Sequence, residues 1–360
     1  MSQARLAREL VARSRRNRLR GYLELLARKM TARRLANMAL NEWEFRTRRV
    51  KLRSLPPQIT LDVTNYCNLH CPLCATGARL HKALPQRIDL QDAERIMARF
   101  AAHSFHVFLY CWGEPLLHPE LPEIVRIARS MNLAVTISSN LQQPLSLDRA
   151  RELVAAGPDV IVASIDGLTQ AVYEHYRAGG SLETALDGLA KLRQARDELG
   201  LDRPLLEWQT LLFRHNLHQA PAIIGRYREL GADRLSFESP NLPFDMADGE
   251  QAQRWLLDPG DDPTSRDVKD NVDGACWWPY RSAIIGVDGS ISPCCYVYGE
   301  QAQWGNMLER DFAQIWNSPK FVALRSVFAH PGSPPPAPCD RCSVTRRFAA
   351  GVEPPVRSNR

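Results

Sequence analysis

The chain has 360 residues, enough for one large domain or about two ordinary ones, and 44% of them are apolar, 24% charged and 8% aromatic. This composition is that of a globular protein and excludes a collagen-like, disordered or disulfide-scaffold chain. No apolar run approaches the ~20 residues that span a bilayer, and the start of the chain has no apolar signal core. We therefore expect a cytoplasmic protein.

The net charge of +6 is unevenly distributed. Residues 1–53 contain 16 Lys or Arg and 4 Glu, a net charge of +12, whereas residues 54–360 contain 30 Lys or Arg and 36 Asp or Glu, a net charge of −6. Leucines at roughly helical spacing in the basic stretch predict a helical arm that packs on the body of the protein, and peripheral contact with an anionic membrane is its alternative use. No helix-turn-helix, zinc-finger or stacking motif accompanies the basic residues, so nucleic acid is not an expected partner.

From about residue 56, short β-rich runs alternate with helical stretches. The runs lack clean polar alternation, as is typical of strands covered on both faces of a parallel sheet. Strands are predicted over residues 58–64, 106–111, 133–138, 159–165, 206–212 and 234–238, and helices over 90–102, 121–131, 147–155, 182–198 and 218–230. Asp89 precedes the first of these helices, and Gly157, Gly200 and Gly231 follow three others. Such βα units in series predict a parallel barrel or an open parallel sheet, with the chemistry of a barrel at the C-terminal ends of its strands.

The last third of the chain has a different pattern. Residues 246–275 are rich in Asp, Gly and Pro, which predicts an exposed acidic linker. Ser282–Gly286 and Ser290–Cys294 flank an Asp-Gly pair, which predicts a β-hairpin. A helix is expected over Leu308–Phe328, followed by a proline-rich loop over residues 331–338.

Three cysteines lie directly after the first predicted strand. Cys67, Cys71 and Cys74 follow a Cys-x3-Cys-x2-Cys pattern, so three thiolates converge in one loop. A structural zinc site takes four ligands, whereas an iron–sulfur cubane held by three cysteines keeps one iron open for a further ligand. Three closely spaced cysteines cannot all pair, and disulfides are not expected in a cytoplasmic chain. The loop therefore predicts an open metal site.

This spacing in this position resembles the signature of the radical S-adenosylmethionine (SAM) superfamily. The resemblance implies an α/β fold, a partial (β/α)6 TIM-like barrel, and a 4Fe–4S cluster on Cys67, Cys71 and Cys74 whose fourth iron binds SAM. It also implies a 5′-deoxyadenosyl radical that abstracts hydrogen from the substrate, and an external electron donor such as flavodoxin or ferredoxin. The family usually has an aromatic residue before its last cysteine; here that residue is Leu73, and weaker stacking near the adenine is expected.

Further matches lie at the ends of later predicted strands. The segment after the second strand resembles the family's Gly-Glu-Pro motif, the one after the third resembles its Thr-Asn-Gly turn with Leu141 where Gly is usual, and the one after the fourth resembles a Ser-Ile-Asp-Gly motif. By this resemblance the SAM contacts are Gly113, Glu114, Pro115, Ser138, Asn140, Ser164 and Arg177, and Asn216 matches a frequent Asn after the fifth strand. Each match alone is often only a turn, but four in order, one at each strand end, favour the assignment.

Four cysteines near the C-terminus form a second set. Cys276, Cys294, Cys339 and Cys342, with a glycine before the second of them, resemble the SPASM/twitch extension of radical SAM enzymes, specifically the short twitch form with one auxiliary 4Fe–4S cluster. A fully ligated cluster has no open iron for substrate, so it would accept an electron or brace the domain. The alternative is a zinc ribbon, which a Cys-x2-Cys pair with a hairpin cysteine suits equally well.

Candidate catalytic residues are fewer. Cys111 and Cys295 are left over from the two sets, and either thiol could return a hydrogen atom to a substrate radical; the alternative for Cys111 is a small buried apolar residue. Cys295 could also replace Cys294 as a ligand, although the spacing selects Cys294. Asp166 and Glu238 end predicted strands and could act as a base on a substrate hydroxyl.

The resemblance covers about residues 57–350. The domains are predicted as a basic helical arm (1–55), the radical SAM partial barrel (56–245), the acidic linker (246–275), the SPASM/twitch-like domain (276–350) and a tail (351–360). The first expected function is oxidation of a carbon in a sugar, cyclitol or similar metabolite. Alternatives are modification of a peptide or protein, for which the arm is too short and too helical to be a winged recognition domain, and redox-neutral epimerisation. A non-catalytic zinc-binding interaction protein would instead contain no iron or sulfide.

Overall fold

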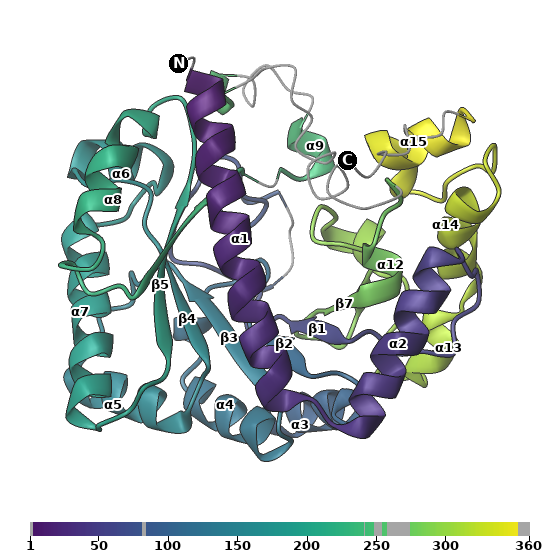
Figure 1. Cartoon of the computed structure of the whole chain (residues 1–360), viewed down its shortest axis with the longest axis horizontal. Helices are drawn as coiled ribbons and strands as arrows, with labels where there is room; N and C mark the ends of the chain where they lie inside the picture. The colour runs from purple at the N-terminus through teal and green to yellow at the C-terminus, as the bar shows by residue number, and fades with distance from the viewer. Residues whose placement is uncertain (1–2, 81–83, 241, 248–253, 258–273, 352–360) are drawn as a thin grey trace.

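The computed structural model describes residues 3–80, 84–240, 242–247, 254–257 and 274–351, and its centre is an eight-stranded sheet (Figure 1). The six predicted strands all form, and each pairs in parallel with its neighbour in the sequence. They are β1 (Gln58–Leu61), β2 (His106–Phe108), β3 (Ala134–Ser139), β4 (Val160–Ser164), β5 (Leu205–Leu211) and β6 (Arg234–Glu238). The fold is therefore the predicted α/β partial (β/α)6 barrel, and the C-terminal ends of its strands lie along one rim.

Helices cover the outer face of this sheet (Figure 1). They are α3 (Leu90–Phe100), α4 (Leu121–Ser130), α5 (Leu147–Ala156), α6 (Gln170–Tyr176), α7 (Leu182–Glu198) and α8 (Ala220–Arg226). The Asp89 carboxylate accepts the Asp92 N–H at 2.8 Å at the start of α3, and Gly157 ends α5 with φ of +87°, so these predicted helix ends are confirmed. The sequence pattern missed α6. It also merged α8 with the short 3-10 helix η2 (Leu217–Gln219) that precedes it.

The N-terminal arm forms two helices that are integral to the fold, α1 (Gln3–Lys29) and α2 (Ala32–Arg46). Figure 1 shows α1 crossing the side of the sheet opposite the outer helices. Leu25 of α1 packs there in a buried cluster with Ala134, Val160, Val162 and Leu205. At the free edge of the sheet, Ser14 Oγ accepts the Phe237 N–H of β6 at 2.8 Å. The predicted helical arm is confirmed, and it covers both the inner face and one edge of the barrel.

Buried polar groups fix α2. The Glu44 carboxylate accepts the backbone N–H groups of Arg53 and Ser54, and the Asn41 amide donates to the Tyr280 carbonyl at 2.7 Å. Because an unsatisfied buried polar group costs about 1–3 kcal/mol, these bonds specify where α2 docks.

The C-terminal domain continues the same sheet. Its elements are α12 (Trp278–Arg281), β7 (Ser282–Ile285), β8 (Ile291–Ser292), the 3-10 helices η4 (Gly299–Ala302) and η5 (Cys339–Arg341), α13 (Phe312–Trp316), α14 (Pro319–Ala329) and α15 (Ser343–Ala349). The predicted hairpin is confirmed, since β7 and β8 pair antiparallel; β7 also pairs in parallel with β1. This pairing places the hairpin directly beside the strand that leads to the first cysteines.

The single helix predicted over Leu308–Phe328 is wrong. The chain breaks between α13 and α14, where the Asn317 side chain accepts the Leu52 N–H at 2.8 Å and donates to the Leu52 carbonyl at 2.9 Å. Pro319 then starts a new helix, because its fixed φ and missing N–H suit a first helical position. Arg325 of α14 is fully buried and donates to the carbonyls of Pro279 and Trp316, which locks this domain together.

Some predictions fall on residues that the structure does not describe. Most of the acidic linker predicted over residues 246–275 lies outside the described ranges, and so does nearly all of the tail predicted over 351–360. The short helix α9 (Phe244–Ala247) precedes the gap. Among the described residues, no helix is both long and apolar enough to cross a membrane.

Candidate functional site: two cysteine sets at the rim of the barrel

The first cysteine set lies in the loop that follows β1. Cys67, Cys71 and Cys74 share a small apolar cluster whose other buried members are Leu69, Leu73, Tyr176, Phe213, Leu242 and Leu256. The loop is tightly folded: the Cys74 N–H donates to the Cys71 carbonyl at 3.2 Å, and a Cβ built on Gly77 would lie 2.5 Å from the Cys71 nitrogen. Only glycine fits that position, so the backbone itself gathers the three thiols.

Polar groups surround these thiols. The Asn140 amide donates to Cys67 Sγ at 3.3 Å, and the Arg177 side chain hydrogen-bonds Cys71. Burial raises the pKa of Cys67 to about 12 and that of Cys71 to about 11, and the neighbouring thiols reinforce both shifts. Three thiolates gathered in a largely apolar loop need compensating positive charge, which iron supplies, so this donor set fits an iron–sulfur cluster with three protein ligands.

The segment after β2 supports the turn that follows β3. A Cβ on Gly113 would lie 1.8 Å from the Thr64 carbonyl oxygen, so the close approach requires glycine. Glu114 is buried, and its carboxylate accepts the Ser139 hydroxyl at 2.6 Å and the Asn140 N–H at 2.8 Å. Pro115 begins the 3-10 helix η1 (Pro115–Leu117). Glu114 thus holds the turn that presents Asn140 to Cys67.

Asp62 also supports this segment, a role that the sequence pattern did not predict. Its carboxylate accepts three consecutive N–H groups, from Cys111 at 3.2 Å, Trp112 at 3.1 Å and Gly113 at 3.3 Å. Desolvation raises the pKa of Asp62 to about 7, and these three bonds oppose the shift. An aspartate just after a strand is the only signal that the sequence offers for it.

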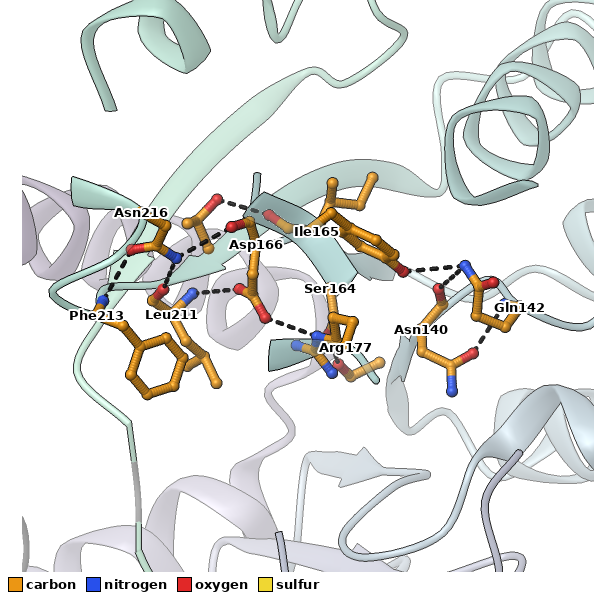
Figure 2. A network of polar contacts seen from close by, with 12 residues as sticks. Asn140, Gln142, Ser164, Ile165, Asp166, Arg177, Leu211, Phe213 and Asn216 are labelled. Carbon is orange, nitrogen blue, oxygen red and sulfur yellow. Dashed lines mark hydrogen bonds and ion pairs between the residues drawn. The ribbon is translucent and has the colours of Figure 1, made fainter. Parts of the chain in front are cut away.

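A polar network joins the ends of β4 and β5 (Figure 2). Arg177 Nε donates to Asp166 Oδ2 at 2.6 Å, and the Leu211 N–H donates to Asp166 Oδ1 at 2.6 Å. The Asn216 amide donates to the carbonyls of Asp166 and Leu211, at 3.0 and 2.7 Å. Burial raises the pKa of Asp166, and the Arg177 guanidinium opposes that shift.

Both oxygens of Asp166 are therefore engaged, and its geometry is that of a fixed counter-ion for Arg177. Ser138 and Ser164, on neighbouring strands, lie beside this network with their hydroxyl oxygens 3.3 Å apart. Leu141 adopts φ of +54°, the left-handed conformation that explains why glycine is usual at this place in the turn. The predicted SAM-binding residues thus converge on the rim next to the first cysteine set.

The second cysteine set gathers around the C-terminal hairpin. Burial raises the pKa of Cys339 well above its ordinary value, and Cys294, Cys276 and Cys342 are the next causes, so the four thiols are neighbours. Cys294 and Cys342 share an apolar cluster with Phe244, Tyr296 and Val297. Four neighbouring cysteines fit a fully ligated cluster. Among the described residues, no group of three or more His, Cys, Asp or Glu could hold a single metal ion.

Cys111 lies between the two sets. Burial raises its pKa well above the ordinary value, and the charges that contribute further include those of Cys294 and Cys74, one from each set. Tyr110, the residue before it, interacts electrostatically with both Cys111 and Cys295. Cys111 is thus near a thiol of each set, and Cys295 is near Tyr110.

The family comparisons agree with this geometry. Residues 61–203 match the model of the radical SAM superfamily, and residues 276–343 match the SPASM model, described as an iron–sulfur cluster-binding domain. The chain belongs to the radical SAM superfamily and carries a C-terminal SPASM domain. It is an iron–sulfur enzyme whose cofactors are a SAM-binding 4Fe–4S cluster, SAM itself and auxiliary iron–sulfur in the SPASM domain.

Relatives match over most of the chain at low identity. A tungsten-containing aldehyde ferredoxin oxidoreductase cofactor-modifying protein from Pyrococcus furiosus is 24% identical, over 74% of this chain and 82% of the relative. A PqqA peptide cyclase from Xanthomonas campestris pv. campestris is 26% identical, over 74% and 75%.

Among solved structures, Streptococcus suis SuiB bound to precursor peptide SuiA has a TM-score of 0.59 at 15% identity, covering 81% of this chain and 71% of that chain. At that identity the likeness shows the fold alone.

Proposed function

We propose that this chain is a radical SAM oxidoreductase that dehydrogenates a hydroxyl-bearing carbon of a small polar metabolite, such as a sugar or cyclitol. When bound to the first cysteine set, the cluster and SAM supply a carbon radical that abstracts hydrogen. An external carrier such as flavodoxin or ferredoxin would supply the initiating electron. Cys276, Cys294, Cys339 and Cys342 would hold an auxiliary cluster able to accept the electron left on the substrate.

The position of α1 carries this proposal. A partial barrel has an open side and a free edge at its last strand, and both could accept an extended peptide. In this chain α1 lies on the inner face of the sheet through Leu25, and its Ser14 takes the Phe237 N–H at the free edge. Because α1 occupies the inner face and the β6 edge, an extended peptide has less room there, which favours a compact substrate.

The chain's own residues have distinct proposed roles. Arg177, held by Asp166, would bind the SAM carboxylate together with Ser164, whereas Asn140 and Glu114 fix the turn beside Cys67. Glu238 is the carboxylate better placed to take the substrate proton, because Asp166 has both oxygens engaged. Cys111 or Cys295 would instead donate hydrogen in an epimerisation.

A deuterated extract tests the proposal even though the substrate has not been identified. Cells grown in deuterated medium supply metabolites and peptides with carbon-bound deuterium. Their extract is returned to ordinary water and divided by a membrane into a retained peptide fraction and a small-molecule fraction. The reconstituted enzyme, SAM and reductant are then added to each fraction, and deuterium in 5′-deoxyadenosine is measured by mass spectrometry. Transfer from the small-molecule fraction is expected. Transfer only from the retained fraction would reject the proposal.

Peptide modification is the second candidate, favoured by the name of the PqqA peptide cyclase relative. Oxidation and epimerisation are separated by the product: in an ordinary extract an oxidised product is lighter by two hydrogens. In heavy water an epimerised product instead gains deuterium at carbon.

A further inference from the structure

The inner face of the barrel carries an ordered set of polar side chains. Strand register places Val162, Glu207 and Arg234 in one layer, and Gln209 and Ser236 in the next layer toward the rim. Leu211 and Glu238 pair at the rim itself. Side chains two residues apart share a face of a strand, so Glu207 and Glu238 both point toward the side that α1 covers.

Two ion pairs occupy this face. Arg234 Nε donates to Glu207 Oε2 at 2.6 Å, and the Glu207 side chain is only 3% exposed, so this pair is internally satisfied. Arg18 of α1 pairs with Glu238, and here the side chains remain 33% and 18% exposed. The Glu207 carboxylate of the first pair is buried, whereas both side chains of the second pair keep part of their surface exposed.

The Arg18–Glu238 pair lies close to the reactive rim. The Glu238 carbonyl accepts the Leu212 N–H at 2.8 Å, and the preceding residue, Leu211, donates its N–H to Asp166. On the other side, Tyr110 interacts electrostatically with Arg18 and also with Cys111 and Cys295. Glu238 therefore ends its strand beside the SAM-binding network, and Tyr110 is near both Arg18 and the leftover cysteines.

We propose that Arg18 and Glu238 form the substrate-recognition pair of this enzyme, with α1 as the wall of its substrate cavity. The inference rests on the proposed function and names the substrate class: a small molecule with neighbouring hydroxyl or amino groups and no net charge. One group accepts from the Arg18 guanidinium and another donates to the Glu238 carboxylate. A substrate that bridges one cation and one anion needs no net charge of its own, because the two charges of the pair compensate each other.

Substitutions on α1 test the proposal with the deuterated small-molecule extract. The quantity measured is the deuterated fraction of the 5′-deoxyadenosine formed, which reports productive substrate binding independently of how much SAM is cleaved. Arg18→Ala is expected to lower this fraction about tenfold or more, because the partly buried Glu238 loses its partner and the substrate loses a charged donor. Arg20→Ala removes the same charge two residues away on an exposed side chain and is expected to leave the fraction unchanged.

Glu238→Gln is the second variant, since it keeps the side-chain shape and does not require α1 to refold. It is expected to lower the deuterated fraction as Arg18→Ala does. If both variants keep the wild-type fraction, the recognition pair is rejected while the proposed function stands. If the wild-type enzyme takes deuterium only from the retained peptides, the proposed function itself fails. Thermal unfolding of each variant separates loss of binding from loss of fold.

Discussion

The two cysteine sets use the same ligand type and both adjoin apolar clusters, but they differ in the number of thiols, and polar side chains contact the thiols of the first. The first has three thiols, donors from Asn140 and Arg177, and a network of carboxylates around its rim. The second has four thiols in an apolar setting, beside the Trp277–Trp278 stack with ring centroids 4.4 Å apart. An open cluster must bind and orient SAM, which needs polar groups, whereas a closed cluster needs shielding from water. The difference predicts that substitutions at the two sites have different consequences.

Loss of a ligand from the first set should have the largest effect. Cys71→Ser is expected to abolish SAM cleavage and to lower iron from about eight to about four per chain, because a cluster with two protein ligands is not retained. Iron analysis and 5′-deoxyadenosine formation under anaerobic conditions measure both quantities. Cys111→Ser is the matched control for iron, since Cys111 belongs to neither set, and equal iron loss in both variants would contradict the assignment.

The corresponding change in the second set should separate initiation from turnover. Cys339→Ser is expected to lower iron by the same amount, about four per chain, yet to retain dithionite-driven SAM cleavage. Complete turnover, in which deuterium transfer is followed by product release, should stop, because the electron left on the substrate has no acceptor. If SAM cleavage disappears as completely as in Cys71→Ser, the two sites are not functionally separate.

Removing one partner of the Arg177–Asp166 ion pair, beside the first cysteine set, should destabilise the fold strongly. Arg177→Met leaves Asp166, which is fully buried, without its counter-ion and is expected to destabilise the fold by about 3–5 kcal/mol. Combining it with Asp166→Asn should recover part of that loss. Urea unfolding of the two single variants and the double variant measures the coupling. Simple additivity of the two losses would show that the pair contributes little.

Asp62, which supports the segment beside the first cysteine set, should make the stability of the fold depend on pH. Its folded pKa, about 7, lies above the ordinary value near 3.9, so between about pH 4 and pH 7 the folded state binds more protons than the unfolded state. Stability from this group is therefore full below about pH 4 and falls as pH rises to about 7. Asp62→Asn should remove that component, so the Tm difference between variant and wild type should change across this window. A constant difference would reject the raised pKa.

The local parts of both sites could be predicted from sequence because their residues are close along the chain. Cys67, Cys71 and Cys74 share one loop, and segments that follow parallel strands meet at one rim whatever the details of packing. The hairpin and the helix ends were likewise predicted from short-range turn and cap chemistry, as at Asp89 and Gly157.

The long-range parts could not be predicted this way. An amphipathic pattern shows that α1 has an apolar side but not that Leu25 packs inside the barrel. The pairing of β7 with β1 joins residues more than two hundred positions apart, and the sequence of a strand does not specify which strand it pairs with. Asp62 was not predicted as a site residue, although its carboxylate accepts three consecutive backbone N–H groups. Burial decides such roles, and burial follows from tertiary packing.

The smallest expected effect concerns the second cysteine set. Thr345 is buried, and its hydroxyl contacts the carbonyl oxygens of Cys339 and Cys342. Thr345→Val keeps the shape and removes the donor, so it should destabilise the apoprotein by about 1–2 kcal/mol. Iron content should be unchanged, because the four thiols and their apolar shell are intact. If iron falls while the Tm holds, the second site depends on polar support as the first does, and the contrast between them is one of ligand number alone.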